Sequence, residues 1–151
     1  VKGAVRLVEQ GFKPLILFHS ISHGKILFEL IKKELKCELL SGKDNSKKRD
    51  KAKNKFESGK IDCLIASKIF DIGLNLPFVS GLIIAGSGKS SVRSLQRIGR
   101  VIRKHDGKEM AAVLDFADKC KYLDKHSKIR RDIYKEEFDK VTWPEKENKN
   151  Q

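Results

Sequence analysis

The sequence predicts an α/β fold in which helices cover both faces of a mostly parallel sheet. Short apolar runs occur at residues 14–18, 62–66, 81–85 and 111–116, with a weaker run at 37–40. Each run is continuously apolar, as in strands that are buried on both faces of a parallel sheet. Amphipathic stretches separate the runs, and this alternation is typical of a three-layer αβα sandwich.

The segments between these strands carry helical signals. The opening residues, VKGAVRLVEQGFK, form a helical pattern from the first position, so the chain is expected to be cut from a longer protein. Residues 21–36 form the next predicted helix. One apolar stripe of this helix comprises Ile26, Leu27, Leu30, Ile31 and Leu35.

Two more helices are predicted from their ends and their periodicity. The helix at 46–58 is expected to begin at a capping side chain, Asn45 or Ser46, and to end before Gly59. The second helix is predicted over 90–104. Its inward-facing residues are Leu95, Ile98 and Ile102.

One globular domain accounts for most of the chain. The core is expected over residues 1–117, followed by a charged helical extension over 118–140. The tail over 141–151 has little to bury and is expected to be disordered.

Composition narrows the class of protein. The 151 residues carry a formal net charge of +13, which favours an anionic partner, above all nucleic acid. A basic, well-solvated surface is the alternative that the charge alone leaves open. The three cysteines lie far apart without metal-binding spacing, as in a reducing, cytoplasmic compartment. No apolar run approaches the roughly 18 residues of a membrane span. Neither a metal site nor a membrane partner is therefore expected.

The strongest functional signal is SLQRIGRVIRK at residues 94–104. Gln96, Arg100 and Arg103 are spaced i, i+4, i+7 and share one face of the predicted helix. Guanidinium groups on one face repel each other unless an anion or carboxylates meet them, and arginine forks suit phosphate oxygens. The face is thus a candidate for phosphate chemistry, and the competing interpretation is an exposed basic helix with structural ion pairs.

The segment LIASKIFDIGLNLP (64–77) combines a buried strand with polar residues. Ser67 ends the strand, where a hydroxyl and free amides can hold a phosphate. Asp71, Gly73 and Asn75 follow, and such residues equally serve as turn formers.

Two further segments are candidates for contact with nucleic acid. In LILFHS, His19 and Ser20 leave the first strand, and the alternative is a surface histidine beside a helix cap. The segment 42–60 is strongly basic, as in a patch that tracks a nucleic-acid backbone or in a solvated helix.

The stretch IIAGSGKSS (83–91) imitates a phosphate-binding P-loop. That motif requires glycine at position 83, where the chain has Ile83, and only Gly86–Ser90 remain to wrap a triphosphate. Asp115 is the only candidate for a magnesium-binding carboxylate after a second strand, which is weak support.

Taken together, LILFHS, LIASKIFDIGLNLP and QRIGRVIR resemble motifs IV, V and VI of superfamily 2 helicases, in that order and with ordinary spacing. The resemblance covers about residues 1–117 and is closest to DNA helicases of the XPB, RecG and phage UvsW type, which have Gln at the start of motif VI. It implies a second RecA-like motor domain. The Walker loop and the DExx carboxylates, which this chain lacks, would lie on a first domain.

The resemblance implies roles by position. The catalytic residues would be Arg100 and Arg103, as arginine fingers on the γ-phosphate, and Gln96. The ATP-binding residues would be Asp71, Gly73 and Asn75. The nucleic-acid-binding residues would be His19, Ser20, Ser67 and Lys89. Asn75 departs from the family, which often has Asp there, so a salt bridge to motif VI is lost.

The function implied is that of the C-terminal motor domain of an ATP-dependent DNA helicase or translocase. ATP with Mg²⁺ would be bound mainly by the missing N-terminal RecA-like domain, without which this chain would be inactive. DNA is favoured over RNA as the partner. Three alternatives stay open: the motor of a restriction or repair nuclease complex, a stand-alone P-loop NTPase or kinase using Gly86–Ser90, and a non-catalytic basic binding module.

Overall fold

The computed structural model describes residues 1–67, 76–86, 111–116, 128–129 and 131–136. In chain order the elements are α1 (Lys2–Glu9), β1 (Pro14–Phe18), α2 (Ile21–Ile31), β2 (Cys37–Leu40), α3 (Ser46–Glu57), β3 (Cys63–Ser67), β4 (Gly81–Ile84) and β5 (Ala112–Asp115). Residues 131–136 are also helical. The predicted helix over 90–104, most of the predicted extension and the predicted tail lie outside the described residues.

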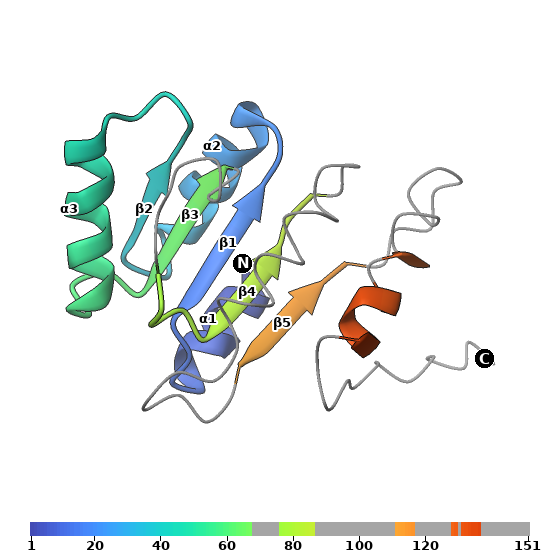
Figure 1. Ribbon diagram of the computed structural model, residues 1–151. Helices are drawn as coiled ribbons and strands as arrows, with labels where there is room; N and C mark the ends of the chain where they lie inside the picture. The colour runs from blue at the N-terminus through green and yellow to red at the C-terminus, as the bar shows by residue number, and fades with distance from the viewer. Residues whose placement is uncertain (68–75, 87–110, 117–127, 130, 137–151) are drawn as a thin grey trace.

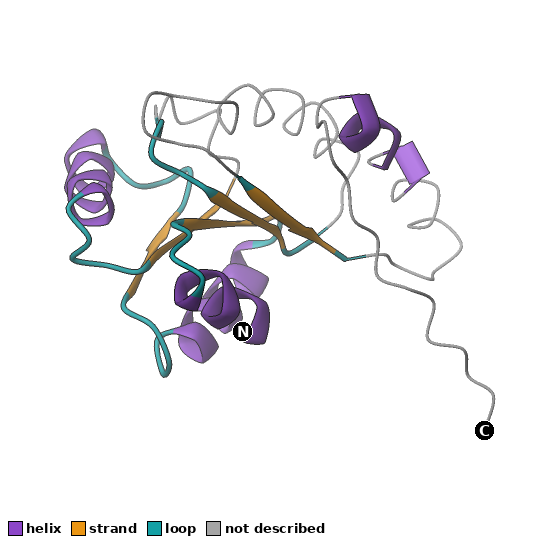
Figure 2. Cartoon of the chain, turned by 90° about the horizontal axis from the view of Figure 1, so that it is seen from below, coloured by secondary structure: helices purple, strands orange, loops and turns teal. Residues whose placement is uncertain are grey.

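The five strands form one sheet in the order β2-β3-β1-β4-β5, and every neighbouring pair is parallel (Figure 1). Each predicted strand is present, with both ends within one residue of the prediction. α1 and α2 cover one face of the sheet and α3 covers the other (Figure 2). The predicted three-layer α/β architecture is therefore confirmed.

Two hydrophobic clusters hold the layers together, one on each face of the sheet. Successive side chains of a strand point to opposite faces, so each central strand contributes to both clusters. In β1, Leu15 packs in the cluster on the α3 side, whereas Ile16 and Phe18 pack in the cluster under α1 and α2. Ala52 and Phe56 anchor α3 and have no exposed surface.

The ends of α3 follow the predicted signals. The Asn45 side chain accepts a hydrogen bond from the backbone N–H of Lys48 at 2.9 Å, which caps the first turn. Gly59 has a φ of 73°. Its N–H donates to the Phe56 carbonyl, and the next N–H, that of Lys60, donates to the Lys55 carbonyl. This is the Schellman arrangement, so the glycine ends the helix as predicted.

The first two helices are shorter than predicted. α1 ends at Glu9 because Gly11 takes a left-handed conformation with φ of 82°. α2 ends at Ile31, five residues before the predicted end. The chain turns there toward β2, where the backbone N–H of Lys36 donates to Asp62 Oδ2 at 2.7 Å.

The buried face of α2 also differs from the predicted stripe. Ile31 is 1% exposed, but Ile26 and Leu30 are 59% and 44% exposed. The helix meets the sheet through Gly24, Leu27, Phe28 and Ile31. The prediction was wrong for Ile26 and Leu30 because every residue from 26 to 31 except Glu29 is apolar, so periodicity does not select the face.

Gly24 is required by packing. A methyl group built on it would lie 2.4 Å from the ring of Phe18, which is itself buried under the helix. Alanine favours an exposed helix by about 1 kcal/mol over glycine, but overpacking typically costs about 1–3 kcal/mol. We expect Gly24→Ala to lower the free energy of unfolding, as measured by chemical denaturation. Gly42→Ala is the control, since a methyl group there meets no atom within 4 Å; equal effects would contradict the packing argument.

Candidate functional site

The carboxyl ends of the five strands meet at one edge of the sheet, which is where open α/β sheets bind ligands. Phe18 lies opposite Ser67 in register, which brings the ends of β1 and β3 together. The backbone N–H of Ala85 donates to the Leu17 carbonyl at 2.8 Å, so the end of β4 lies on the other side of β1. This edge, called here the carboxyl edge, is therefore continuous across the central strands.

His19 and Ser20 lie at the centre of the carboxyl edge and are exposed. Ser20 is the N-cap of α2, but its side chain makes no capping hydrogen bond; its hydroxyl pairs with the Ser22 hydroxyl at 2.7 Å. The start of α2, with its partial positive charge, thus lies at the same edge. These groups form a polar, uncrowded surface suited to an anion.

Gly86 brings the segment after β4 close to His19. A methyl group built on Gly86 would lie 3.7 Å from the His19 backbone nitrogen and 3.8 Å from His23 Nδ1. Its φ of 151° is one that side chains rarely adopt. Glycine is therefore suited to this position by both backbone conformation and close approach.

Position 83 does not lie in a loop. Ile83 is 5% exposed, belongs to β4 and pairs in register with Ile16 and Leu114. A P-loop that began at this position would have to begin inside a hydrogen-bonded strand. The sheet therefore argues against a self-contained phosphate loop in this stretch.

Ser67 is the one buried polar residue of the described core, at 7% exposure. Its Oγ accepts a hydrogen bond from the backbone N–H of Gly42 at 3.2 Å, which ties the loop after β2 to the end of β3. The hydroxyl keeps its own hydrogen to donate. Its predicted contact with a nucleic-acid phosphate stays a prediction.

Arg49 is a candidate that the sequence did not single out. Its Nη2 donates to the Gly42 carbonyl at 3.2 Å. Its Nε is buried and has no hydrogen-bond partner within the part of the chain that the structure describes. The hydrogen bond from Nη2 lies at an exposed position, so the outer edge of the guanidinium is open to an anion such as a phosphate. The only signal in the sequence was that Arg49 is the one arginine in the basic run 42–60.

Asp44 holds the loop that carries Gly42. Its Oδ2 accepts hydrogen bonds from the Ser41 N–H at 2.6 Å and the Ser41 hydroxyl at 3.1 Å, and its Oδ1 accepts one from Lys48 Nζ at 2.7 Å. Burial raises the pKa of the Asp44 carboxyl, but the hydrogen bonds from Lys48 and Ser41 outweigh burial and leave the pKa below its ordinary value. The loop is thus fixed beside Arg49 and Ser67.

Asp115, the weak magnesium candidate, is engaged by protein groups. Its Oδ1 accepts the Phe116 N–H at 2.8 Å and its Oδ2 accepts the Tyr134 hydroxyl at 3.0 Å. Among the residues described, no group of three or more His, Cys, Asp or Glu side chains gathers to hold a metal ion. Both oxygens of the Asp115 carboxylate are therefore hydrogen-bonded within the protein.

Tyr134 links the predicted extension to the core. It is 7% exposed and belongs to the hydrophobic cluster on the α3 side of the sheet. The predicted boundary after residue 117 stays a prediction.

None of the helices described is both long and apolar enough to cross a membrane.

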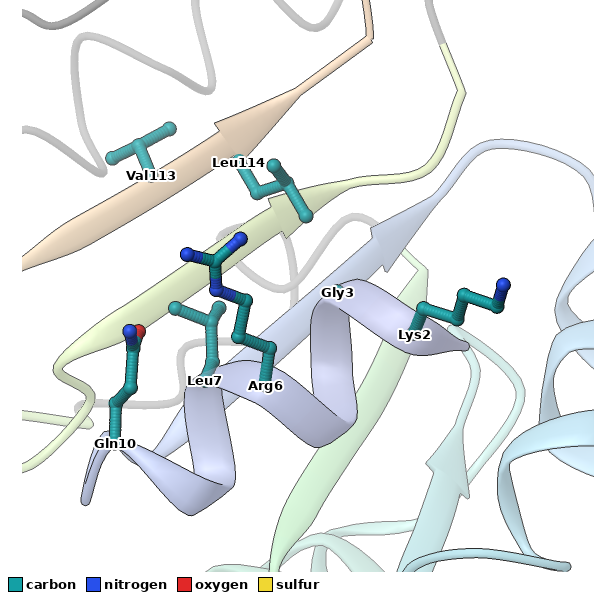
Figure 3. A pocket seen from close by; sticks show the side chains of 7 residues that line it. All are labelled: Lys2, Gly3, Arg6, Leu7, Gln10, Val113 and Leu114. Atoms are coloured by element: carbon teal, nitrogen blue, oxygen red, sulfur yellow. The ribbon is translucent and has the colours of Figure 1, made fainter.

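A cavity of about 370 Å³ lies between α1 and β5 (Figure 3). Leu7 and Leu114 give it apolar walls, and Arg6 reaches toward it from α1. None of the predicted site residues lines this cavity. It is therefore separate from the candidate site at the carboxyl edge.

The remaining predicted site residues lie outside the described residues, and their roles stay predictions. They are Asp71, Gly73, Asn75, Lys89, Gln96, Arg100 and Arg103.

Comparison with known proteins identifies the family. Residues 2–105 match the family described as helicase conserved C-terminal domain. The chain is 35% identical over 119 residues to the ATP-dependent DNA helicase uvsW of Enterobacteria phage T4. The aligned region covers 78% of this chain and 24% of that protein. It is 30% identical over 76 residues to the DNA 3'-5' translocase XPB2 of Sulfurisphaera tokodaii, which covers 50% of this chain and 17% of that protein.

The solved structures agree. The crystal structure of T4 UvsW matches with a TM-score of 0.70 at 30% sequence identity, covering 90% of this chain and 31% of that chain. The chain thus spans about a quarter of the length of the phage helicase that it resembles. The RecA-like fold and the resemblance to superfamily 2 helicases of the XPB and UvsW type are confirmed. Since the family match covers residues 2–105 and hence most of the chain, the protein belongs to the helicase conserved C-terminal domain family.

Proposed function

We propose that this chain is the C-terminal motor domain of an ATP-dependent superfamily 2 helicase that acts on DNA. The observation that carries the nucleic-acid half of this proposal is Arg49. Its guanidinium donates from an exposed position to the Gly42 carbonyl, and Gly42 in turn is joined to Ser67 at the carboxyl edge. A phosphate oxygen is the acceptor that a guanidinium suits best.

ATP would be held between this domain and an N-terminal RecA-like domain. Arg100 and Arg103 would meet the charge that develops on the γ-phosphate, with Gln96 beside them. Asp71, Gly73 and Asn75 would line the nucleotide from this side. Mg²⁺ neutralises charge on the phosphates during transfer, and its ligands would come from the N-terminal domain. The position of Ile83 inside β4 supports this shared site over a stand-alone P-loop.

The carboxyl edge would bind the phosphate backbone of the nucleic acid. His19, Ser20, Ser67 and Lys89 would join Arg49 in contacting phosphates rather than bases. DNA is the proposed nucleic acid because the relative with 35% identity is named a DNA helicase. Binding through phosphates predicts little preference for sequence and a strong dependence on salt.

The test is the salt dependence of DNA binding by the 151-residue chain. Binding is measured by fluorescence anisotropy on unrelated single-stranded and duplex oligonucleotides over a series of salt concentrations. Each phosphate neutralised contributes about 0.9 to the slope of log affinity against log salt on duplex DNA, and about 0.7 on single strands. We expect Arg49→Gln to lower the slope by about that amount on every sequence. Arg49→Lys should retain the slope, because it keeps the charge.

The control is Lys33→Gln, which makes the same change of charge at an exposed residue just beyond α2. Its slope should stay near that of the unaltered chain. An unchanged slope in Arg49→Gln, or a thousandfold preference for one sequence, would rule out a backbone contact at Arg49. Circular dichroism verifies that each variant is folded.

A further inference from the structure

The outward face of α3 carries a row of lysines that the proposed site does not use. Lys47, Lys51 and Lys55 are spaced i, i+4, i+8 and therefore share one face of the helix. Lys60 lies just beyond the helix and continues the row. These four lysines line an open groove of about 850 Å³. The rest of the lining consists of Ser46, Asp50, Asn54 and Ser58.

We propose that this groove, called here the α3 groove, is a second contact surface for DNA that binds the backbone of a duplex. The inference rests on the proposed function, because it takes the protein to act on DNA. It adds a surface that is separate from the carboxyl edge and states which form of DNA that surface fits.

The charge of the α3 groove is not balanced within the protein. Four lysines against the one carboxylate of Asp50 leave a formal charge of +3 on the lining. Lys55 pairs with Glu38 on β2. Lys47, Lys51 and Lys60 have no ion-pair partner among the residues that the structure describes. Neighbouring cations of this kind are stabilised when a polyanion meets them.

The geometry of the row suits a duplex that lies along the helix. Four residues of α-helix advance about 6 Å, so the lysines repeat at that spacing. Each strand of duplex DNA offers a phosphate for about every 3.4 Å of its axis. Lys47 and Lys51, one such step apart, can therefore reach neighbouring phosphates of a duplex that lies against the helix. The side chains of Ser46 and Asn54 in the lining add neutral donors for phosphate oxygens.

The lining also argues against single-stranded DNA as the occupant. Surfaces that bind single strands combine positive charge with aromatic side chains on which bases stack. All eight residues that line the α3 groove are polar, and none is aromatic. The surface can therefore read backbone charge but offers no platform for unpaired bases.

The α3 groove is distinct from the Arg49 contact. Arg49 is two positions from both Lys47 and Lys51, and residues two apart on a helix do not face each other. The far end of the groove, at Lys55 and Lys60, lies beyond the turn that holds Arg49 against Gly42. α3 itself lies at the β2 end of the sheet, away from β4 and β5 (Figure 1).

The experiment compares two double variants of the 151-residue chain that remove the same charge. Lys51→Gln/Lys60→Gln removes two positive charges from the lining of the α3 groove. Lys33→Gln/Lys36→Gln removes two exposed lysines beyond the end of α2. We expect the first variant to lower the salt slope on duplex DNA by about 1.8, from two contacts of about 0.9 each. The second variant should leave the duplex slope nearly unchanged.

Single-stranded oligonucleotides and Arg49→Gln separate this inference from the proposed function. On single strands, both double variants should behave alike, whereas Arg49→Gln should weaken binding to both forms of DNA. Equal losses from the two double variants on duplex DNA would overturn the inference and leave the Arg49 result intact. Polyglutamate serves as a probe for an acidic protein segment. If Lys51→Gln/Lys60→Gln weakens the binding of polyglutamate but not of duplex DNA, the groove binds an acidic segment and the duplex assignment is wrong. A loss confined to the α3 groove variant, with Arg49→Gln unchanged, would support the groove and refute the contact at the carboxyl edge.

Discussion

Replacing Arg100 or Arg103 with alanine in the full-length protein is expected to lower the rate of ATP hydrolysis by roughly 10³–10⁵-fold, the range measured for arginine fingers in other phosphoryl-transfer enzymes. The spacing of these residues within QRIGRVIR would place both on one face of the predicted helix with Gln96. An arginine that meets charge developing in the transition state acts on the chemical step, so kcat should fall. A phosphate-release assay at saturating ATP and DNA measures the effect.

Arg97→Ala is the matched control, because the resemblance to superfamily 2 helicases implies that Arg97 supports motif VI structurally and does not contact a phosphate. It should retain most of the ATPase activity, and the melting temperatures of Arg100→Ala and Arg103→Ala should stay close to that of the unaltered protein. ATP hydrolysis within about twofold of the unaltered rate for both Arg100→Ala and Arg103→Ala would refute the arginine-finger assignment.

The 151-residue chain alone should hydrolyse ATP only at the background rate of the assay, because the proposed ATP site is shared with a second domain. Ile83 lies inside β4, where a phosphate-binding loop would have to begin. DNA-stimulated hydrolysis by the purified chain would mean that it contains a complete ATP site, which would rule out a site shared between two domains.

Ile31→Ala is expected to lower the free energy of unfolding by about 2–5 kcal/mol, whereas Ile26→Ala should change it by less than about 0.5 kcal/mol. Both residues lie in α2 and lose the same atoms, so the effect on helix propensity is shared. Only their burial differs, since Ile31 is 1% exposed and Ile26 is 59% exposed. The removed side chain leaves a cavity at Ile31 and open solvent at Ile26.

Urea denaturation followed by circular dichroism measures both changes in one experiment. The midpoint should fall for Ile31→Ala with an unchanged dependence on denaturant. Equal destabilisation by the two variants would show that α2 packs through the stripe predicted from the sequence. A larger effect at Ile26 would mean that the helix is rotated from the orientation described here.

The strands could be predicted because their signals are local. A strand buried on both faces is a continuous apolar run, and in this chain such runs are bounded by residues that disfavour or interrupt pairing, such as Pro14 and Gly81. The same holds for the end of α3, where Gly59 takes the left-handed conformation that ends the helix. The face of α2 could not be predicted in this way. Its apolar residues surround most of the helix, and the choice between Ile26 and Ile31 depends on the sheet beneath.

The sequence by itself determined the α/β class, the family, and the positions of His19, Ser20 and Ser67 directly after or at the ends of strands. It did so because apolar runs and motifs are written in consecutive residues. Only the tertiary structure decided what meets at the carboxyl edge. Gly42 and Ser67 are 25 residues apart and are joined by one hydrogen bond, which exists because β2 and β3 are neighbours in the sheet. Parallel strands are connected by crossovers, so their order is set by how helices pack across the sheet. That order brings Gly42, and with it the guanidinium of Arg49 that donates to its carbonyl, to Ser67, a juxtaposition that no local pattern encodes.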